Sequence, residues 1–168
     1  LFINKKSPDS LLIETGISNL RFISSAGDNP GSANIDSERV KKVISFIKKL
    51  NADTVILDLG PGTSFNVLDF FNMSSKGIVM SSPETTSVMK TFSFVRSALF
   101  RRISRQLKNL SALQKLVDHS KPTNADLETY TVATLKENIK KIDKTQIEKV
   151  EEIINEFKPA IIINRVRN

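Results

Sequence analysis

The chain has 168 residues, no cysteine and a net charge of +7, with 26% charged and 39% hydrophobic residues. This length and balance predict one folded domain with a sizeable core, and the lack of cysteine excludes disulfides and thiolate metal sites. No run approaches the roughly twenty apolar residues of a membrane-spanning helix. Because a chain without cysteine fits a reducing compartment, we expect a cytoplasmic protein.

The first fifty residues predict a short helix, a strand and an amphipathic helix, in that order. Residues 9–13 favour a helix and residues 19–24 a strand. After a loop with two glycines and a proline, Asp36 or Ser37 is expected to cap a helix that reaches Leu50. The apolar positions at helical spacing are Val40, Val43, Ile44, Ile47 and Leu50. Lysines lie mostly opposite, so this helix is expected to cover a sheet.

The segment VILDLGPGTS, residues 55–64, places a carboxylate at the end of an apolar run. Residues 54–59 favour a strand buried on both faces. A charge such as Asp58 at the end of a buried strand is costly unless something pairs with it. Gly60 and Gly62 allow a tight turn directly after it.

The rest of the chain alternates helices and strands. Helices are predicted at 64–73, from Pro83–Glu84 past Arg105, at 124–142 and at 145–157, and strands at 77–82 and 159–164. This alternation predicts an α/β fold with a parallel sheet and helices on both faces.

Three polar segments follow predicted strands and are expected to meet at one sheet edge. They are residues 58–63, 81–84 and 164–165. At such an edge Asp58 could hold Mg²⁺ through water, backbone amides near Gly60 and Gly62 could meet a phosphate, and Asn164 offers the paired donor and acceptor that adenine requires.

Three segments together resemble the MinD/ParA/Mrp branch of P-loop ATPases, especially the MinD-like group that includes flagellar-number regulators. ADTVILDLGPGTSFNVLDFF resembles the Walker B strand and switch II region, IVMSSPETTSV the following strand and helix start, and AIIINRVRN the adenine-side strand. Their order and separation agree with the family as well. The resemblance implies a Rossmann-like three-layer P-loop NTPase core, ATP and Mg²⁺ as cofactors, and a homodimer that closes on ATP.

By this resemblance, Asp58 would be the catalytic and metal-binding carboxylate. The cofactor-binding residues would be Gly60, Gly62, Thr63, Pro83, Asn164 and Arg165. The two glycines would form the switch turn that senses the terminal phosphate, and Asn164 would contact adenine. Pro83, Glu84 and Ser87 would lie where such ATPases dimerise or meet a partner, although Lys90 stands where the family often has an acidic residue.

The chain departs from the family in lacking a phosphate-binding P-loop. It contains neither G-x-x-x-x-G-K-[ST] nor the deviant K-G-G-x-G-K-[ST]. In the family this loop follows the first strand, so we expect residues 1–168 to be a single α/β domain cut from a longer ATPase, without its P-loop strand and C-terminal elements. Such a piece is expected to hydrolyse little ATP alone.

Two other functions stay open. The VILDL strand with its glycine-proline turn also resembles the phosphorylated-aspartate strand of receiver domains, although the expected acidic pair and lysine are missing. Alternatively, the chain is a non-hydrolysing scaffold whose basic helix binds DNA, an anionic membrane or a partner protein. That basic stripe consists of Arg96, Arg101, Arg102, Arg105 and Lys108. The single histidine, His119, has no metal-ligand partner in the sequence and is expected to lie in a loop or in solvent.

Overall fold

The computed structural model describes residues 8–24, 37–74, 76–107 and 131–166. They form a mixed α/β structure with five α-helices and two small sheets, one of them parallel. The chain divides into two compact units, residues 1–58 and 59–168. The predicted positions Asp36, Lys108, His119 and 124–130 fall outside the described residues.

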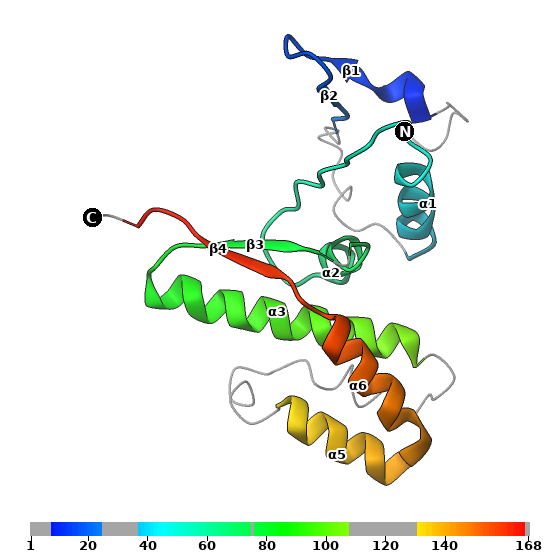
Figure 1. Ribbon diagram of the computed structural model, residues 1–168, viewed down its shortest axis with the longest axis vertical. Coiled ribbons are helices and arrows are strands. Elements are labelled where there is room, and N and C mark those ends of the chain that lie inside the picture. The colour runs from blue at the N-terminus through cyan, green and yellow to red at the C-terminus, as the bar shows by residue number, and fades with distance from the viewer. Residues whose placement is uncertain (1–7, 25–36, 75, 108–130, 167–168) are drawn as a thin grey trace. The chain divides into compact units, whose positions relative to one another are not determined.

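The first unit holds a short hairpin and one amphipathic helix (Figure 1). A 3-10 turn, η1 (Pro8–Leu11), leads into β1 (Ile13–Glu14), which pairs antiparallel with β2 (Arg21–Phe22). The strand predicted at 19–24 is therefore shorter, and the helix predicted at 9–13 gives way to the 3-10 turn and β1. α1 (Ser37–Ile47) confirms an amphipathic helix, because Val40 is fully buried while Lys41 and Lys42 are exposed. The helix ends at Ile47, before the predicted end at Leu50.

The strand predicted at residues 54–59 is wrong. The segment carries no strand assignment, and Ile56 is 87% exposed. An extended segment becomes a strand only through hydrogen bonds to a neighbouring strand, and no described segment pairs with it. The apolar, β-branched composition predicted the extended conformation without specifying a partner.

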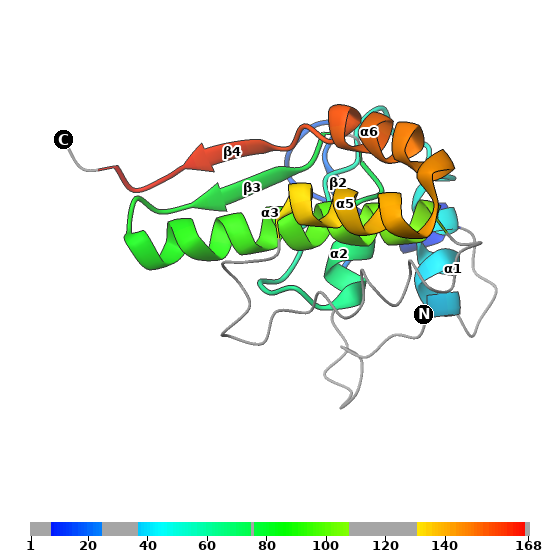
Figure 2. The same cartoon turned by 90° about the horizontal axis from the view of Figure 1, so that it is seen from below.

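In the second unit, two parallel strands lie against one long helix (Figure 2). β3 (Ile78–Ser81) pairs with β4 (Ala160–Ile163), so that Ile78 faces Ala160 and Ser81 faces Ile163. The connection between them runs through α3 (Thr85–Gln106), α5 (Val132–Ile142), the 3-10 turn η2 (Lys144–Gln146) and α6 (Ile147–Glu156). These elements confirm the predicted helices and strands of this region to within a few residues where they are described.

Only part of this parallel pair is buried. β3 packs on α3, and Ser81 is buried, but Ile78 and Met80 are exposed. All four residues of β4 are exposed. The described residues show the predicted parallel pairing but not helices on both faces of it, because no described helix covers the side of the pair that carries Ile78 and Met80.

The core of the second unit gathers around the C-terminal half of α3. Near its C-terminal end, apolar residues of α3 pack on α5 and α6. The fully or nearly fully buried side chains of this cluster are Ile103, Leu107, Leu135, Ile139, Val150 and Ile153. A smaller cluster joins α2 (Phe65–Phe71) to Ala98 of α3, and Phe157 packs against both clusters.

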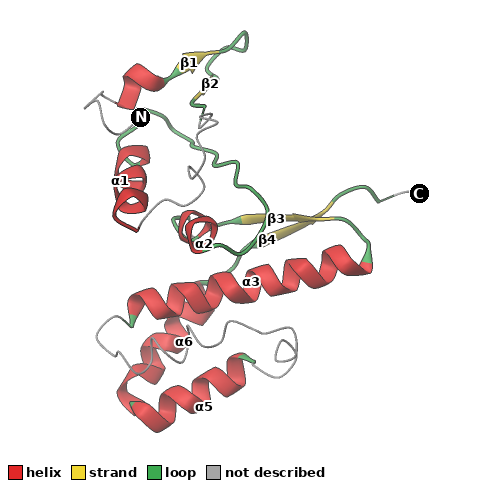
Figure 3. Ribbon diagram, turned by 180° about the vertical axis from the view of Figure 1, so that it is seen from behind, coloured by secondary structure: helices red, strands yellow, loops and turns green. Residues whose placement is uncertain are grey.

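An ion cluster also fastens α2 to α3, and we call it the Asp69 clamp. The Asp69 carboxylate, only 2% exposed, accepts hydrogen bonds from Nε and Nη2 of Arg101 at 2.8 and 3.0 Å. Arg105 Nη2 donates a third at 2.7 Å. The Arg101 guanidinium also lies 4.2 Å from the centre of the Phe65 ring, a cation–π arrangement. Figure 3 shows α2 lying beside α3 from behind.

We expect Asp69→Ala to lower the free energy of unfolding by about 3 kcal/mol, because two partly buried guanidinium groups would lose their counter-charge. The matched control is Glu151→Ala, which removes the exposed ion pair with Lys136 and should cost less than about 1 kcal/mol. Urea unfolding followed by circular dichroism measures both. Equal losses of unfolding free energy in the two variants would mean that burial does not strengthen the ion pairs of the clamp.

Gly77 is required by the ring of Phe71. A Cβ atom at residue 77 would overlap that ring, whereas a Cβ at Gly60 would meet no atom within 4 Å. We therefore expect Gly77→Ala to destabilise the protein by about 1–3 kcal/mol through overpacking. Gly60→Ala is the matched control and should change stability far less. Thermal unfolding of both variants measures this. An unchanged melting temperature in Gly77→Ala would show that the Phe71 ring moves aside without cost.

Candidate functional site

The carboxyl ends of β3 and β4 form a small polar pocket. Parallel pairing continues one step past the strands, since the Asn164 amide donates to the Ser81 carbonyl at 2.7 Å. The pocket has a volume of about 230 Å³ and is lined by Met80, Ser81, Ser82, Ser87, Asn164 and Arg165. Because pockets for whole small-molecule ligands span about 300–1,000 Å³, this shallow pocket would contact only part of a ligand.

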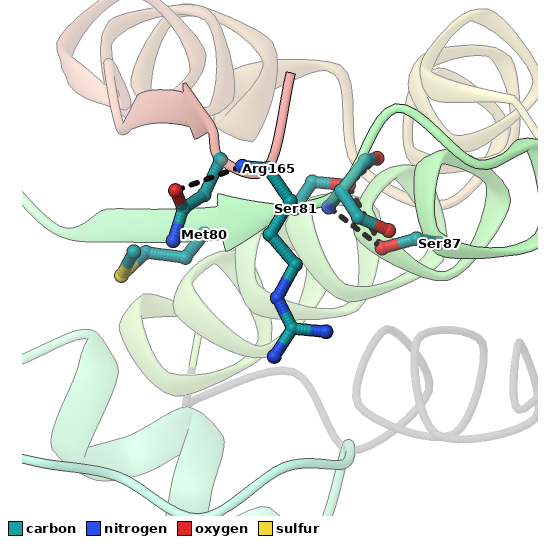
Figure 4. Close-up of a pocket in the computed structure, with 6 residues that line it drawn as sticks. Met80, Ser81, Ser87 and Arg165 are labelled. Atoms are coloured by element: carbon teal, nitrogen blue, oxygen red, sulfur yellow. Dashed lines mark hydrogen bonds between the residues drawn. The ribbon is translucent and has the colours of Figure 1, made fainter. Parts of the chain in front are cut away.

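Three serines join β3 to the first turn of α3 at this pocket. The Ser81 and Ser87 hydroxyls lie 3.0 Å apart, and Ser87 Oγ accepts a hydrogen bond from the Ser82 amide at 3.1 Å (Figure 4). Ser82 Oγ donates to Glu84 at 3.2 Å. The strand end is thus tied to the helix start by side chains, and the wall of the pocket is preorganised.

Asn164 and Arg165 form the other side of the pocket. The Asn164 side-chain oxygen accepts a hydrogen bond from the Arg165 amide at 2.8 Å, which fixes the orientation of the carboxamide. Its NH₂ group then remains as a donor, and the oxygen keeps a second lone pair as an acceptor. Arg165 has a positive φ of 59°, a conformation uncommon outside glycine. This turns the chain sharply at the end of β4.

The glycine turn lies before α2. Gly62 has a φ of 109°, which only glycine adopts readily, and Gly60 and Thr63 are exposed. Ser64 ends the turn and caps α2 by accepting a hydrogen bond from the Val67 amide at 3.4 Å. The sequence therefore located both the turn and the helix start after it correctly.

The structure brings together only some of the predicted site residues. Asn164 and Arg165 line one pocket with Ser81 and Ser82, as the convergence of strand ends predicts. Pro83, Gly60, Gly62 and Thr63 do not line it. Asp58 is exposed and ends the first unit. Among the described residues, no three acidic or histidine side chains gather as a ready metal site, so a cation at Asp58 would need ligands from the nucleotide or water.

Much of the predicted basic stripe is engaged within the protein. Arg101 and Arg105 bind Asp69, and Arg102 lies 3.5 Å from Glu156. Their side chains are only 14–30% exposed. The sequence showed arginines close together but not the single buried carboxylate of α2 that pairs with two of them. Asp69 faces the core side of a short helix, and an acidic residue between Leu68 and Phe70 was the one available signal.

None of the described helices is long and apolar enough to cross a lipid bilayer. Comparison of the chain with protein-family models, with curated proteins and with solved structures finds no match.

Proposed function

We propose that the chain is the base-binding and switch part of a MinD/ParA-like ATP-dependent switch. In this proposal β3 and β4 are two strands of a larger parallel sheet in a three-layer P-loop NTPase fold. The observation that carries the proposal is the parallel register of β3 and β4, which places Asn164 and Arg165 beside Ser81 and Ser82. In parallel α/β sheets, ligands bind outside the carboxyl ends of the strands.

The chemistry of the pocket favours a purine base. The Asn164 carboxamide is held by the Arg165 amide and still offers one donor and one acceptor side by side. The adenine edge presents the complementary pair, an exocyclic amine and a ring nitrogen. A pocket of about 230 Å³ suits the base, while the sugar and phosphates would extend outside it. On its N7 edge guanine presents two acceptors, N7 and O6, where adenine has an acceptor and a donor, so on that edge guanine matches the carboxamide less well.

The turn of Gly60 to Thr63 is the proposed phosphate sensor. It combines exposed backbone amides with a glycine at positive φ, and such turns bind anions through their N–H groups. Asp58 precedes it directly and would act on Mg²⁺ and the attacking water. A switch of this kind needs different affinities for ATP in its two states, and the glycine turn is the element that could change between them.

The two alternatives gain less support. A receiver domain needs an acidic pair and a lysine beside its phosphoacceptor, and the sequence has Ser24 and Ser25, and Asn164 and Arg165, at the corresponding places. The absence of a strand at residues 54–59 weakens the receiver interpretation and the Walker B resemblance alike. A scaffold that binds DNA or membrane through the basic stripe needs accessible guanidinium groups, whereas Arg101 and Arg105 are paired with Asp69. Dimerisation on ATP, with Pro83 and Glu84 near the contact, remains part of the proposal.

Asn164→Ala should weaken Mg-ATP binding roughly thirtyfold, because it removes two hydrogen bonds to the base, each worth about 1 kcal/mol. Selectivity for ATP over GTP should fall with it. Asn155→Ala, an exposed asparagine on α6, is the matched control and should bind normally. Isothermal titration with both nucleotides measures this, and unchanged affinity and selectivity in Asn164→Ala would remove the base from this pocket.

Asp58→Ala should lower Mg-ATP turnover roughly a hundredfold, the scale of losing a group that stabilises charge in the transition state. Asp53→Ala, which removes another exposed carboxylate five residues earlier, should leave turnover unchanged. Phosphate release at saturating Mg-ATP gives both rates. Equal rates for Asp58→Ala and the unaltered protein would exclude Asp58 from the mechanism.

A further inference from the structure

The glycine turn is anchored at both ends on the same part of the second unit. Before it, Leu59 packs against the cluster of Leu68, Phe71 and Ala98. After it, Ser64 caps α2. The residues between these anchors, 60–64, are exposed. A rearrangement of the turn that moves either anchor would therefore act on α2 and on its contacts with α3.

α2 depends on α3 for its position. It has only seven residues, and helices this short are not stable alone in water. Its apolar contacts are Leu68 and Phe71 on Ala98, with the Phe71 and Phe94 rings edge to face at 4.9 Å. At its C-terminal end, Asn72 Nδ2 donates to the Ala98 carbonyl at 2.9 Å.

The Asp69 clamp makes this docking sensitive to small shifts. Its three hydrogen bonds all run from α3 to one carboxylate of α2, and the bidentate pair with Arg101 requires a fixed orientation of both groups. A carboxylate that is 2% exposed must lose these bonds together when α2 moves off, and it then gains water instead. Two discrete states, docked and released, follow more naturally from this chemistry than gradual sliding.

We propose that α2 is a releasable arm, held by the Asp69 clamp, that couples the conformation of the glycine turn to α3. The inference rests on the proposed function only in taking that turn as the element that responds to nucleotide. α3 also supplies Ser87 to the pocket wall at its other end, so one helix contacts both the base pocket and the arm. Release would also free Arg101 and Arg105 from their counter-ion. The conformation of the turn would then change how much positive charge α3 exposes.

Hydrogen–deuterium exchange of the full 168-residue chain tests the arm without any nucleotide. Asp69→Asn keeps the size of the side chain but removes its charge, and we expect amides of residues 65–72 to exchange about tenfold faster. Amides of α5 and α6 should exchange as before. If Asp69→Asn does not fold, Arg105→Ala removes only one of the three hydrogen bonds and should give a smaller increase in the same segment.

A double-mutant cycle tests the coupling itself. Gly62→Ala forces a side chain onto a φ of 109°, whereas Gly60→Ala meets open space at an ordinary φ. We expect Gly62→Ala to speed exchange in residues 65–72 in the unaltered chain and to add little in Asp69→Asn, where the arm is already released. Gly60→Ala should have no effect in either background.

Three outcomes would overturn the proposal. They are unchanged exchange of α2 in both Asp69→Asn and Arg105→Ala, an equal rise across α3, α5 and α6, and strictly additive effects of Gly62→Ala and Asp69→Asn. The second would make Asp69 a residue of general stability. If the protein fails to bind ATP but shows faster exchange confined to residues 65–72 and non-additive effects of the two substitutions, the proposed function is refuted and the releasable arm is supported.

Discussion

The burial of one helix, α3, is the constraint on which the second unit depends. Its C-terminal half supplies Ile103 and Leu107 to the larger cluster and Ala98 to the smaller one. Phe157, the residue that ends α6 just before β4, packs against both clusters. The helix therefore fixes the short helix α2, the α5–α6 pair and the start of β4 together. The polar pocket takes its position from the same helix, because Ser87 belongs to its first turn.

Local sequence patterns predicted the elements whose stability is local or periodic. The apolar spacing predicted α1, Pro83 and Glu84 predicted the start of α3, and Ser64 marked the start of α2, each to within a few residues. The same reasoning failed at residues 54–59, because a β-branched run reports extended backbone but not the neighbour that would make it a strand. It also failed for the burial of β4, since Ile161 to Ile163 are apolar and nevertheless exposed.

The candidate site was predictable where topology alone determines it. Parallel strands bring their carboxyl ends to the same edge, and this rule placed Ser81 and Ser82 with Asn164 and Arg165. The Asp69 clamp could not be predicted in this way. It depends on the side-chain orientations of Asp69 and of two arginines that follow it 32 and 36 positions later in the sequence. Charge clustering suggested arginines directed towards a partner, whereas burial directs two of them towards α2. Counting charges along a sequence identifies cations without identifying their counter-ions.

The exposed strand pair has a practical consequence for any experiment on this chain. Within the described part of the chain, no further strand pairs with the outer edges of β3 and β4, and Ile78, Ile161, Ile162 and Ile163 are exposed. Such edges are templates for pairing between chains, and the run of isoleucines has the high β-propensity and low charge of aggregating segments. Aggregation of the chain is therefore expected to depend on its concentration, on temperature and on time, in addition to its folded stability. A lysine at an exposed position of β4 would oppose pairing between chains and keep the protein monodisperse.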